Sequence, residues 1–204
     1  ILDHDPGRVR YRRLKSPMTL DTHFDEPSWE RIRQQWCAWW EHDLDHCLVV
    51  IDGMPGPDEP GQEVVGPWEG FSSNFPLEAP VDEVLAFFEP GLRTRRALGD
   101  GWPRWWPNFG PGIVAGFLGA QLEPALDTVW FSSPAPGAFD ELHPIRDDSN
   151  PWWLRIRELT RAAVERWGRS LTVGFTDLGG NLDILASLRS TQQLLLDLYD
   201  SPEE

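Results

Sequence analysis

Short apolar runs alternate along this chain with longer stretches whose apolar residues recur at helical spacing, and turns rich in Gly and Pro separate the two kinds of segment. The strand-like runs lie at residues 47–51, 102–108, 127–131 and 171–176, and the helical stretches lie at residues 27–43, 81–98, 150–167 and 182–188. Strand patterns that alternate with helical patterns indicate crossover connections between parallel strands. The alternation therefore predicts an α/β fold with a parallel sheet.

The ends of the helical stretches have their own signals. Asn150 followed by Pro151 is typical of a helix N-terminus, and Gly168 is typical of the position after a helix. Inside the second helical stretch, Pro90 and Gly91 predict a kink or a break, because proline removes a backbone donor and glycine weakens a helix. The pattern thus predicts one long continuous helix and one interrupted helix.

The charge balance excludes two classes of partner. The chain has 18 Lys and Arg against 33 Asp and Glu, which gives a formal net charge of -15. An acidic surface repels nucleic-acid phosphates and anionic lipid headgroups, so we expect neither nucleic acid nor a membrane as a partner. The chain has no apolar run of about 20 residues, the length that a spanning helix needs. Cys37 and Cys47 are the only cysteines, which fits a reducing compartment, and we expect a cytoplasmic protein.

Both ends of the sequence differ from what lies between them. Residues 1–17 are basic although the chain as a whole is acidic, and the first methionine is Met18. We therefore expect residues 1–17 to be an upstream or non-native extension, with a native basic arm as the alternative. Ser201 before Pro202 is typical of a helix N-terminus, which leads us to expect that residues 18–204 are part of a longer domain.

Several ordered motifs resemble one enzyme superfamily. They are the stretch GFTDLGGNLDILASLR at residues 174–189, the stretch LLDLYDSPE at residues 195–203, the turn FGPG at residues 109–112, and Trp130. Together they resemble the uroporphyrinogen decarboxylase-like superfamily, especially a Trp-rich uncharacterised branch. The likeness runs from about Trp29 to the last residue. Ser190 departs from the pattern, because members usually have glycine after the arginine.

The resemblance implies a fold and a class of chemistry. Members are (β/α)8 TIM barrels of well over 300 residues, so this chain corresponds to the N-terminal half. They include porphyrinogen decarboxylases and cobalamin-linked methyltransferases, the latter with a zinc site late in the chain and a corrinoid partner. The decarboxylases hold a polycarboxylate with an arginine-bearing loop, whereas residues 52–61 here contain Asp52, Asp58 and Glu59 and no arginine. This favours methyl transfer, or decarboxylation of another small substrate.

Candidate site residues follow the predicted strands, because the site of a TIM barrel lies at the C-terminal ends of its strands. Asp177 and Asp183 flank a Gly-Gly turn and are the predicted catalytic pair, as acid, base or ligand. The alternative is that Asp183 caps the next helix while Asp177 stabilises the turn. The residues expected to bind substrate are Asp52, Asn108, Gly110, Gly112, Trp130 and Arg189.

Each substrate-binding prediction has a structural alternative. Gly110 and Gly112 permit backbone amides to approach an anionic group, or they make a plain tight turn. Arg189 binds a substrate carboxylate, or it forms an ordinary salt bridge. His42 and His46 are spaced like metal ligands, but the predicted helix ends between them, so no metal site is predicted there.

The tryptophans and the class of protein leave rival interpretations open. Of the 12 Trp residues, we expect most to fill core, with Trp102, Trp105, Trp106 and Trp130 as the exceptions. Exposed in a row, such rings bind sugars, so a carbohydrate-binding module is one rival. A barrel scaffold without catalysis is another. A homodimer is compatible with the sequence, and the isolated half barrel is expected to be inactive and to associate.

Overall fold

The computed structural model describes residues 20–53, 70–125, 128–134 and 145–200. Along the chain the elements are α1 (Glu26–Trp40), β1 (Val50–Gly53), the 3-10 turn η1 (Ser72–Asn74), α2 (Val81–Thr94), β2 (Arg96–Gly99), β3 (Arg104–Trp105), α3 (Ile113–Phe117), β4 (Gln121–Pro124), β5 (Val129–Ser132), α4 (Pro151–Trp167), β6 (Thr172–Val173), α5 (Asn181–Arg189) and α6 (Thr191–Asp200). Helices and strands are mixed, as the α/β prediction required. The predicted extension at residues 1–17 lies outside the described residues.

The strands form three separate pairs within the described part of the chain. β3 and β6 are parallel, with Arg104 opposite Thr172 and Trp105 opposite Val173. β1 pairs with β2 and β4 pairs with β5, and both of these pairs are antiparallel. The prediction of parallel strands is therefore confirmed for one pair and wrong for the other two. Only residues 125–128 separate β4 from β5, which are too few for the crossover that a parallel return needs.

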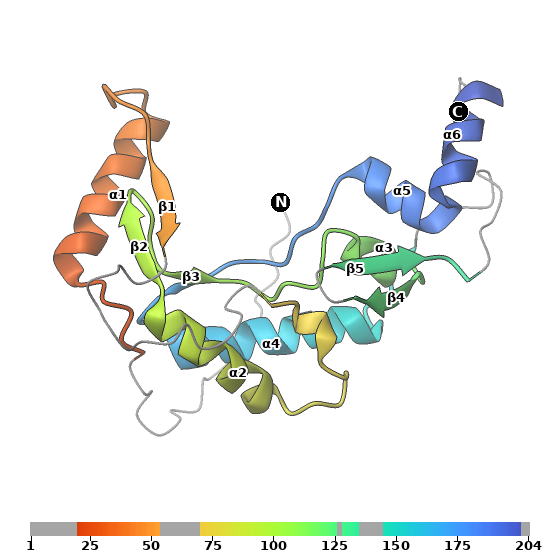
Figure 1. Ribbon diagram of the computed structural model, residues 1–204, viewed down its shortest axis with the longest axis horizontal. Helices are drawn as coiled ribbons and strands as arrows, with labels where there is room; N and C mark the ends of the chain where they lie inside the picture. The colour runs from red at the N-terminus through yellow and green to blue at the C-terminus, as the bar shows by residue number, and fades with distance from the viewer. Residues whose placement is uncertain (1–19, 54–69, 126–127, 135–144, 201–204) are drawn as a thin grey trace, which may run out of the picture.

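The parallel pair sits over the core at the middle of the molecule. In Figure 1, α2 and α4 lie along one side of β3 and β6, while α1 with β1 and β2 rises at one end and α5 with α6 rises at the other. The buried apolar residues shared by these helices and β3 are Val84, Leu85, Phe88, Leu92, Trp105, Leu159, Ala163 and Trp167. The two ends of the molecule therefore project from one central core.

Trp105 lies inside this core. Its side chain is 3% exposed, and its ring centroid lies 5.6 Å from that of Phe88 and 5.1 Å from that of Trp167. The expectation that Trp105 is exposed was wrong. A strand of two residues buries one side chain in the layer above α2 and α4, and the sequence alone does not say which face of β3 points inward.

The helix ends follow from their capping residues. Asn150 accepts hydrogen bonds from the amides of Trp152 and Trp153 through its side-chain oxygen, at 3.0 and 3.2 Å, so the predicted start of α4 is confirmed. Its amide nitrogen also donates to the carbonyls of Gly116 and Phe117, which ties α4 to α3. α2 continues through Pro90 to Thr94, so the proline does not split the helix.

Candidate functional site

Two turns meet at the ends of the parallel strands. The first contains Gly110 and Gly112 and follows β3, and the second contains Asp177 and Gly179 and follows β6. Gly179 has φ +63°, and a Cβ atom there would lie 2.0 Å from the carbonyl oxygen of Pro111, so only glycine permits this approach. The structure thus brings together two sequence motifs that are about 65 residues apart, at the end of the strands where the barrel interpretation expects a site.

The first turn is shaped by the packing of β5. A Cβ atom on Gly112 would lie 2.4 Å from Cδ2 of Phe131, so the absence of a side chain lets the Phe131 ring rest on the turn. Asn108 accepts a hydrogen bond from the Gly110 amide at 3.1 Å, which closes the turn locally. The following helix α3 has only five residues. These contacts support the tight-turn alternative for Gly110 and Gly112.

The two carboxylates of the second turn differ in their partners. Asp177 accepts a hydrogen bond from the amide of Gly179 at 2.9 Å, as the turn-stabilising alternative predicted. The N-cap of α5 is Gly180, so Asp183 is not the cap residue; it lies in the first turn of α5, where the helix dipole favours negative charge. Its exposed carboxylate has no hydrogen-bond or ion-pair partner among the described residues. Asp183 is the member of the pair that is free to contact a ligand.

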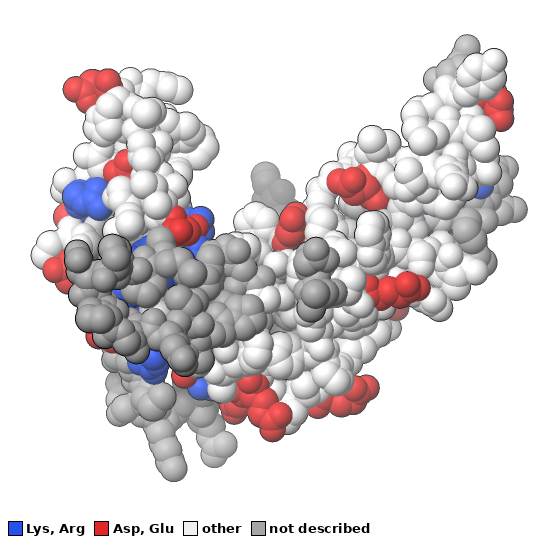
Figure 2. All heavy atoms as spheres, in the orientation of Figure 1, with Lys and Arg blue, Asp and Glu red and all other residues white. Residues whose placement is uncertain are grey.

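Exposed apolar side chains flank these carboxylates in the sequence. Phe175, Leu178 and Leu182 are exposed along the chain on either side of Asp177. Figure 2 shows acidic side chains scattered over the visible face, whereas the Arg side chains lie mostly toward the α1, β1 and β2 end. The turn therefore offers an apolar and acidic surface, which repels a polycarboxylate substrate.

Asp52 lies at the other end of β3. Its Oδ2 atom is 2.5 Å from Nη2 of Arg95 and 2.6 Å from Nη2 of Arg104, the first residue of β3. Arg95 is almost completely buried, and Arg104 also stacks over the Trp102 ring at 5.6 Å from its centroid. Because β1 pairs with β2 in place of a central strand, Asp52 is positioned away from the turns that contain Asp177 and Asp183. The contacts make it an anchor between β1, β2 and β3.

Arg189 connects two helices. Its Nε and Nη2 atoms donate to the two carboxylate oxygens of Asp197 at 2.7 and 2.9 Å, and both side chains are largely buried. Hydrogen bonds from Arg189 and then from Gln193 hold the pKa of Asp197 below its usual range. The contacts support the salt-bridge alternative for Arg189, which joins α5 to α6.

The exposed tryptophans do not form one row. Trp130 lies on β5 opposite Glu123 and is 64% exposed, whereas Trp40 lies at the end of α1. The rings of Trp39 and Trp40 meet edge to face at 77°, as do those of Trp36 and Trp102 at 88°. Stacked sugars need open ring faces along one surface, so this arrangement does not favour the carbohydrate-binding rival.

No group of three or more His, Cys, Asp and Glu within the described ranges is placed to hold a metal ion. His46 contacts Asp45 at 2.7 Å between Nδ1 and Oδ1, and His42 has a left-handed backbone at φ +62°. Zinc held by residues of the described segments therefore has no support in this geometry.

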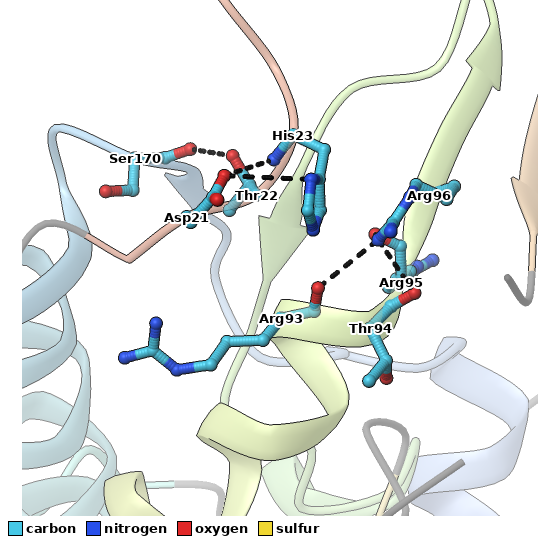
Figure 3. Close-up of polar contacts among 8 residues, drawn as sticks. All are labelled: Asp21, Thr22, His23, Arg93, Thr94, Arg95, Arg96 and Ser170. Atoms are coloured by element: carbon cyan, nitrogen blue, oxygen red, sulfur yellow. Dashed lines mark hydrogen bonds and ion pairs between the residues drawn. The ribbon is translucent and has the colours of Figure 1, made fainter. Parts of the chain in front are cut away.

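Figure 3 shows two separate sets of polar contacts that the sequence did not indicate, one that ties residues before α1 to Ser170 after α4 and one at the end of α2. Thr22 donates from Oγ1 to the carbonyl of Ser170 at 3.1 Å, and the His23 amide donates to Asp21 at 2.9 Å. Nη1 of Arg96 donates to three successive carbonyls, those of Arg93, Thr94 and Arg95. The guanidinium thereby caps the C-terminus of α2. Local sequence signals do not reveal the contact between Thr22 and Ser170, which are far apart in the chain.

The hydrogen bond from the His23 amide is the main cause that lowers the pKa of Asp21. Because the Asp21 carboxylate is exposed and bonds to a neighbour in sequence, this shift reflects a local turn. The polar contacts in Figure 3 are therefore structural, and they add no residue to the candidate site.

Comparisons with family models, curated proteins and solved structures find no match for the chain. The superfamily likeness therefore stays a prediction drawn from the sequence motifs. Among the helices of the described segments, none combines the length and the apolar character needed to cross a lipid bilayer.

Proposed function

We propose that this chain supplies consecutive units of a uroporphyrinogen decarboxylase-like (β/α)8 barrel. The observation that carries the proposal is the parallel pairing of β3 and β6 across the intervening helix α4. α4 contacts β6 and packs on α2, as a crossover helix does when it returns the chain to the start of the next parallel strand. The antiparallel pairs β1–β2 and β4–β5 are, in this view, additions at the periphery of the barrel units.

The proposed activity is methyl transfer to or from a small neutral or cationic substrate. Decarboxylation of a small substrate is the alternative reaction. The site is the pair of touching turns after β3 and β6. Asp183 would orient a cationic or hydrogen-bond-donating group of the substrate, and Asp177 would hold the turn that positions Asp183. Carboxylates at this place oppose binding of a polyanion, so methyl transfer is the favoured reaction.

The resemblance also implies zinc and a corrinoid partner. The described residues hold no cluster that fits zinc, and none of the sequence motifs quoted for the likeness supplies a His and Cys ligand set. We therefore derive no chemical step through either group. What this chain itself contributes is the acidic, partly apolar surface at the strand ends, where the substrate binds.

An NMR titration of the chain with two opposite probes tests the proposal. We expect tetramethylammonium to shift the amide resonances of Gly110, Gly112, Gly179 and Gly180, because a methylated cation is attracted to Asp183 and to apolar neighbours. Citrate, a polycarboxylate, is expected to leave these resonances in place. Tighter binding of citrate, or shifts that avoid both turns, would contradict the proposal.

A pair of matched variants identifies the carboxylate responsible. Asp183→Asn removes the charge that we assign to substrate binding and should weaken the tetramethylammonium response. Asp45→Asn removes an exposed charge at the α1 end of the molecule and serves as the control. If both variants weakened the tetramethylammonium response equally, only the overall charge of the chain would matter for binding.

A further inference from the structure

α4 has a second face that is open. One side packs on the core through Leu159, Ala163 and Trp167, whereas the other side borders a groove of about 510 Å³. The groove has an apolar floor that includes Trp153 and Val164. Its opposite wall is the segment after β6, including Phe175 and Leu178. A helix that is apolar on two sides requires a partner on each side.

Two polar atoms in this groove have no partner. Thr176 lines the groove and is 4% exposed, yet its hydroxyl makes no hydrogen bond with any described residue. The Nε1 atom of Trp153 is also buried without a partner. An unsatisfied buried polar group costs about 1–3 kcal/mol, so the walls of the groove are less favourably packed than the core side of α4.

The rim of the groove is positively charged in an otherwise acidic molecule. Arg157 stacks over the Trp153 ring at 5.7 Å from its centroid, and neither Arg157 nor Arg161 has an ion-pair partner among the described residues. Glu165 follows Arg161 by one helical turn. The groove therefore favours an occupant that is apolar along one face and acidic at its edge.

The length of the groove suits a helix. Its α4 wall extends from Trp153 to Glu165, which corresponds to about 18 Å at about 1.5 Å per helical residue. A groove with a helix as one wall and an extended segment as the other is a common receptor for an amphipathic helix. A helix of about three turns would fill it.

This chain has such a helix in α6. Leu195, Leu198 and Tyr199 form a stripe at i, i+3 and i+4, and they are 62%, 60% and 85% exposed. The opposite side of α6 faces α5 through Asp197, which pairs with Arg189, and Leu194 is buried beside the stripe. α6 spans ten residues, or about 15 Å, and it contains no basic residue.

α6 does not reach the groove of its own chain. Among the contacts between elements α6 packs on α5, and Figure 1 shows it projecting from the end of the molecule farthest from α1, away from the middle of α4. A second chain can bring its α6 to the groove without this restriction. The exposed stripe and the open groove are thus two halves of one contact that a single chain cannot make.

We propose that the chain forms a homodimer in which α6 of each copy occupies the α4 groove of the other. The leucine and tyrosine stripe covers Trp153, Val164 and Leu178, and the acidic end of α6 at Asp200 lies toward Arg157 and Arg161. When the two copies are related by a two-fold axis the exchange is reciprocal, and the assembly closes at two copies.

Sedimentation velocity on the whole chain over a concentration series tests the dimer. Leu198→Glu in α6 and Val164→Glu in the groove should each raise the dimer dissociation constant at least about tenfold, since a carboxylate must be desolvated in an apolar contact. Trp40→Glu, at an exposed apolar position on α1, is the matched control and should leave the dissociation constant unchanged. A monomer at every concentration, or association that neither α6 nor groove variants weaken, would overturn the proposal.

Mixing the two variants separates this arrangement from its nearest alternative. Val164→Glu keeps an intact α6 and Leu198→Glu keeps an intact groove, so an equimolar mixture should form a heterodimer through one good contact. A dimer formed by pairing of α6 with α6 would show no such recovery in the mixture. A mixture that does not recover dimerisation would therefore contradict the groove assignment. Circular dichroism of each variant verifies that the helices are retained.

A charge exchange provides a test that leaves the apolar contact intact. Arg161→Glu alone should weaken the dimer, and combination with Asp200→Lys should restore part of the lost affinity, because both side chains are exposed in the single chain. If the loss of dimer affinity in the double variant equals the sum of the losses in the two single variants, the proposed alignment of α6 in the groove is wrong.

Discussion

The middle of the molecule and its α1 end were built from similar sequence patterns, yet only the middle has the predicted topology. β3 and β6 are parallel and lie over two long helices, whereas β1 and β2 form an antiparallel ribbon. In the middle, Trp105 and Trp167 are buried against each other. In the ribbon, Ile51 and Leu98 lie opposite each other and both stay half exposed.

The difference shows what the alternating pattern specifies. Where a long amphipathic helix separates two strands, the crossover is long enough to make them parallel, and burial on α2 and α4 fixes the register. The ribbon lacks a layer of comparable packing, and polar contacts hold it: Asp52 bridges Arg95 and Arg104, and Asp100 accepts hydrogen bonds from the Val49 amide and from Arg31. We therefore expect the middle to depend on apolar burial and the ribbon to depend on ion pairs.

The largest expected effect is the removal of Trp167 from the middle. Trp167→Ala should lower the free energy of unfolding by about 3–5 kcal/mol, because it opens a cavity beside Trp105 and removes an indole that donates to Glu89. Trp40→Ala at the α1 end, where the ring is 70% exposed, should change this free energy by less than about 0.5 kcal/mol. Urea denaturation measures both. Similar losses would mean that the two regions are equally packed.

A smaller effect is expected from the anchor of the ribbon. Asp52→Asn keeps the shape of the side chain but leaves the buried Arg95 without its carboxylate, and we expect a loss of about 2 kcal/mol. The control Asp45→Asn removes an exposed carboxylate and should be close to neutral. If high salt reduces the Asp52 effect to zero, the pair is too solvated to anchor the ribbon.

The sequence predicted the parts of the fold whose signals are local. Asn150 and Gly168 predicted the ends of α4, and the apolar spacing predicted α1 and α5 to within a few residues. Residues 96–98 were predicted to continue a helix, but they form β2. The tertiary contacts of Arg95 with Asp52, and the cap that Arg96 provides for α2, override helical spacing there.

The candidate site was predictable only where it depends on local sequence signals. The turns after β3 and β6 follow from the strand pattern and the glycines, and the structure places them in contact. β4 was missed because Glu123 and Pro124 are unusual in strands. Asp52 was expected near Asp177, since the sequence does not reveal that β1 pairs with β2 outside the parallel unit.

Acid should affect the middle through one carboxylate between α2 and α4. Burial raises the pKa of Glu89, but hydrogen bonds from Arg166 and Trp167 outweigh it and leave the pKa below its ordinary value. A carboxyl whose pKa is lowered by folding stabilises the protein above the unfolded pKa, and this contribution is lost as the pH falls through the folded pKa. The free energy of unfolding should therefore decline in acid below the usual glutamate range.

Glu89→Gln isolates this contribution. The variant should be less stable than the parent at neutral pH and should show a shallower decline in acid, as followed by urea denaturation at a series of pH values. Asp147→Asn is the comparison, because the pKa of Asp147 is lowered by a hydrogen bond from Ser149 in an exposed loop outside the α2–α4 contact. An unchanged acid limb in Glu89→Gln would assign the decline to other carboxyl groups.

The smallest expected effect lies at the corner between α5 and α6, where Ser190 departs from the pattern of the superfamily that the motifs resemble. Ser190 has φ +74° and ψ 143°, a conformation that glycine adopts without strain and that costs other residues about 1–3 kcal/mol. Its hydroxyl also accepts a long hydrogen bond from the Gln193 amide, at 3.3 Å, and this cap offsets part of the strain energy.

Replacement of Ser190 by glycine relieves the strain, but it removes the cap and increases the conformational entropy of the unfolded chain. We expect Ser190→Gly to raise the free energy of unfolding by about 0.5–1 kcal/mol, and Ser190→Ala, which keeps the strain and loses the cap, to lower it. If Ser190→Gly and Ser190→Ala raised the free energy of unfolding equally, the backbone at this corner would be relaxed. A glycine at this position would then have no conformational role.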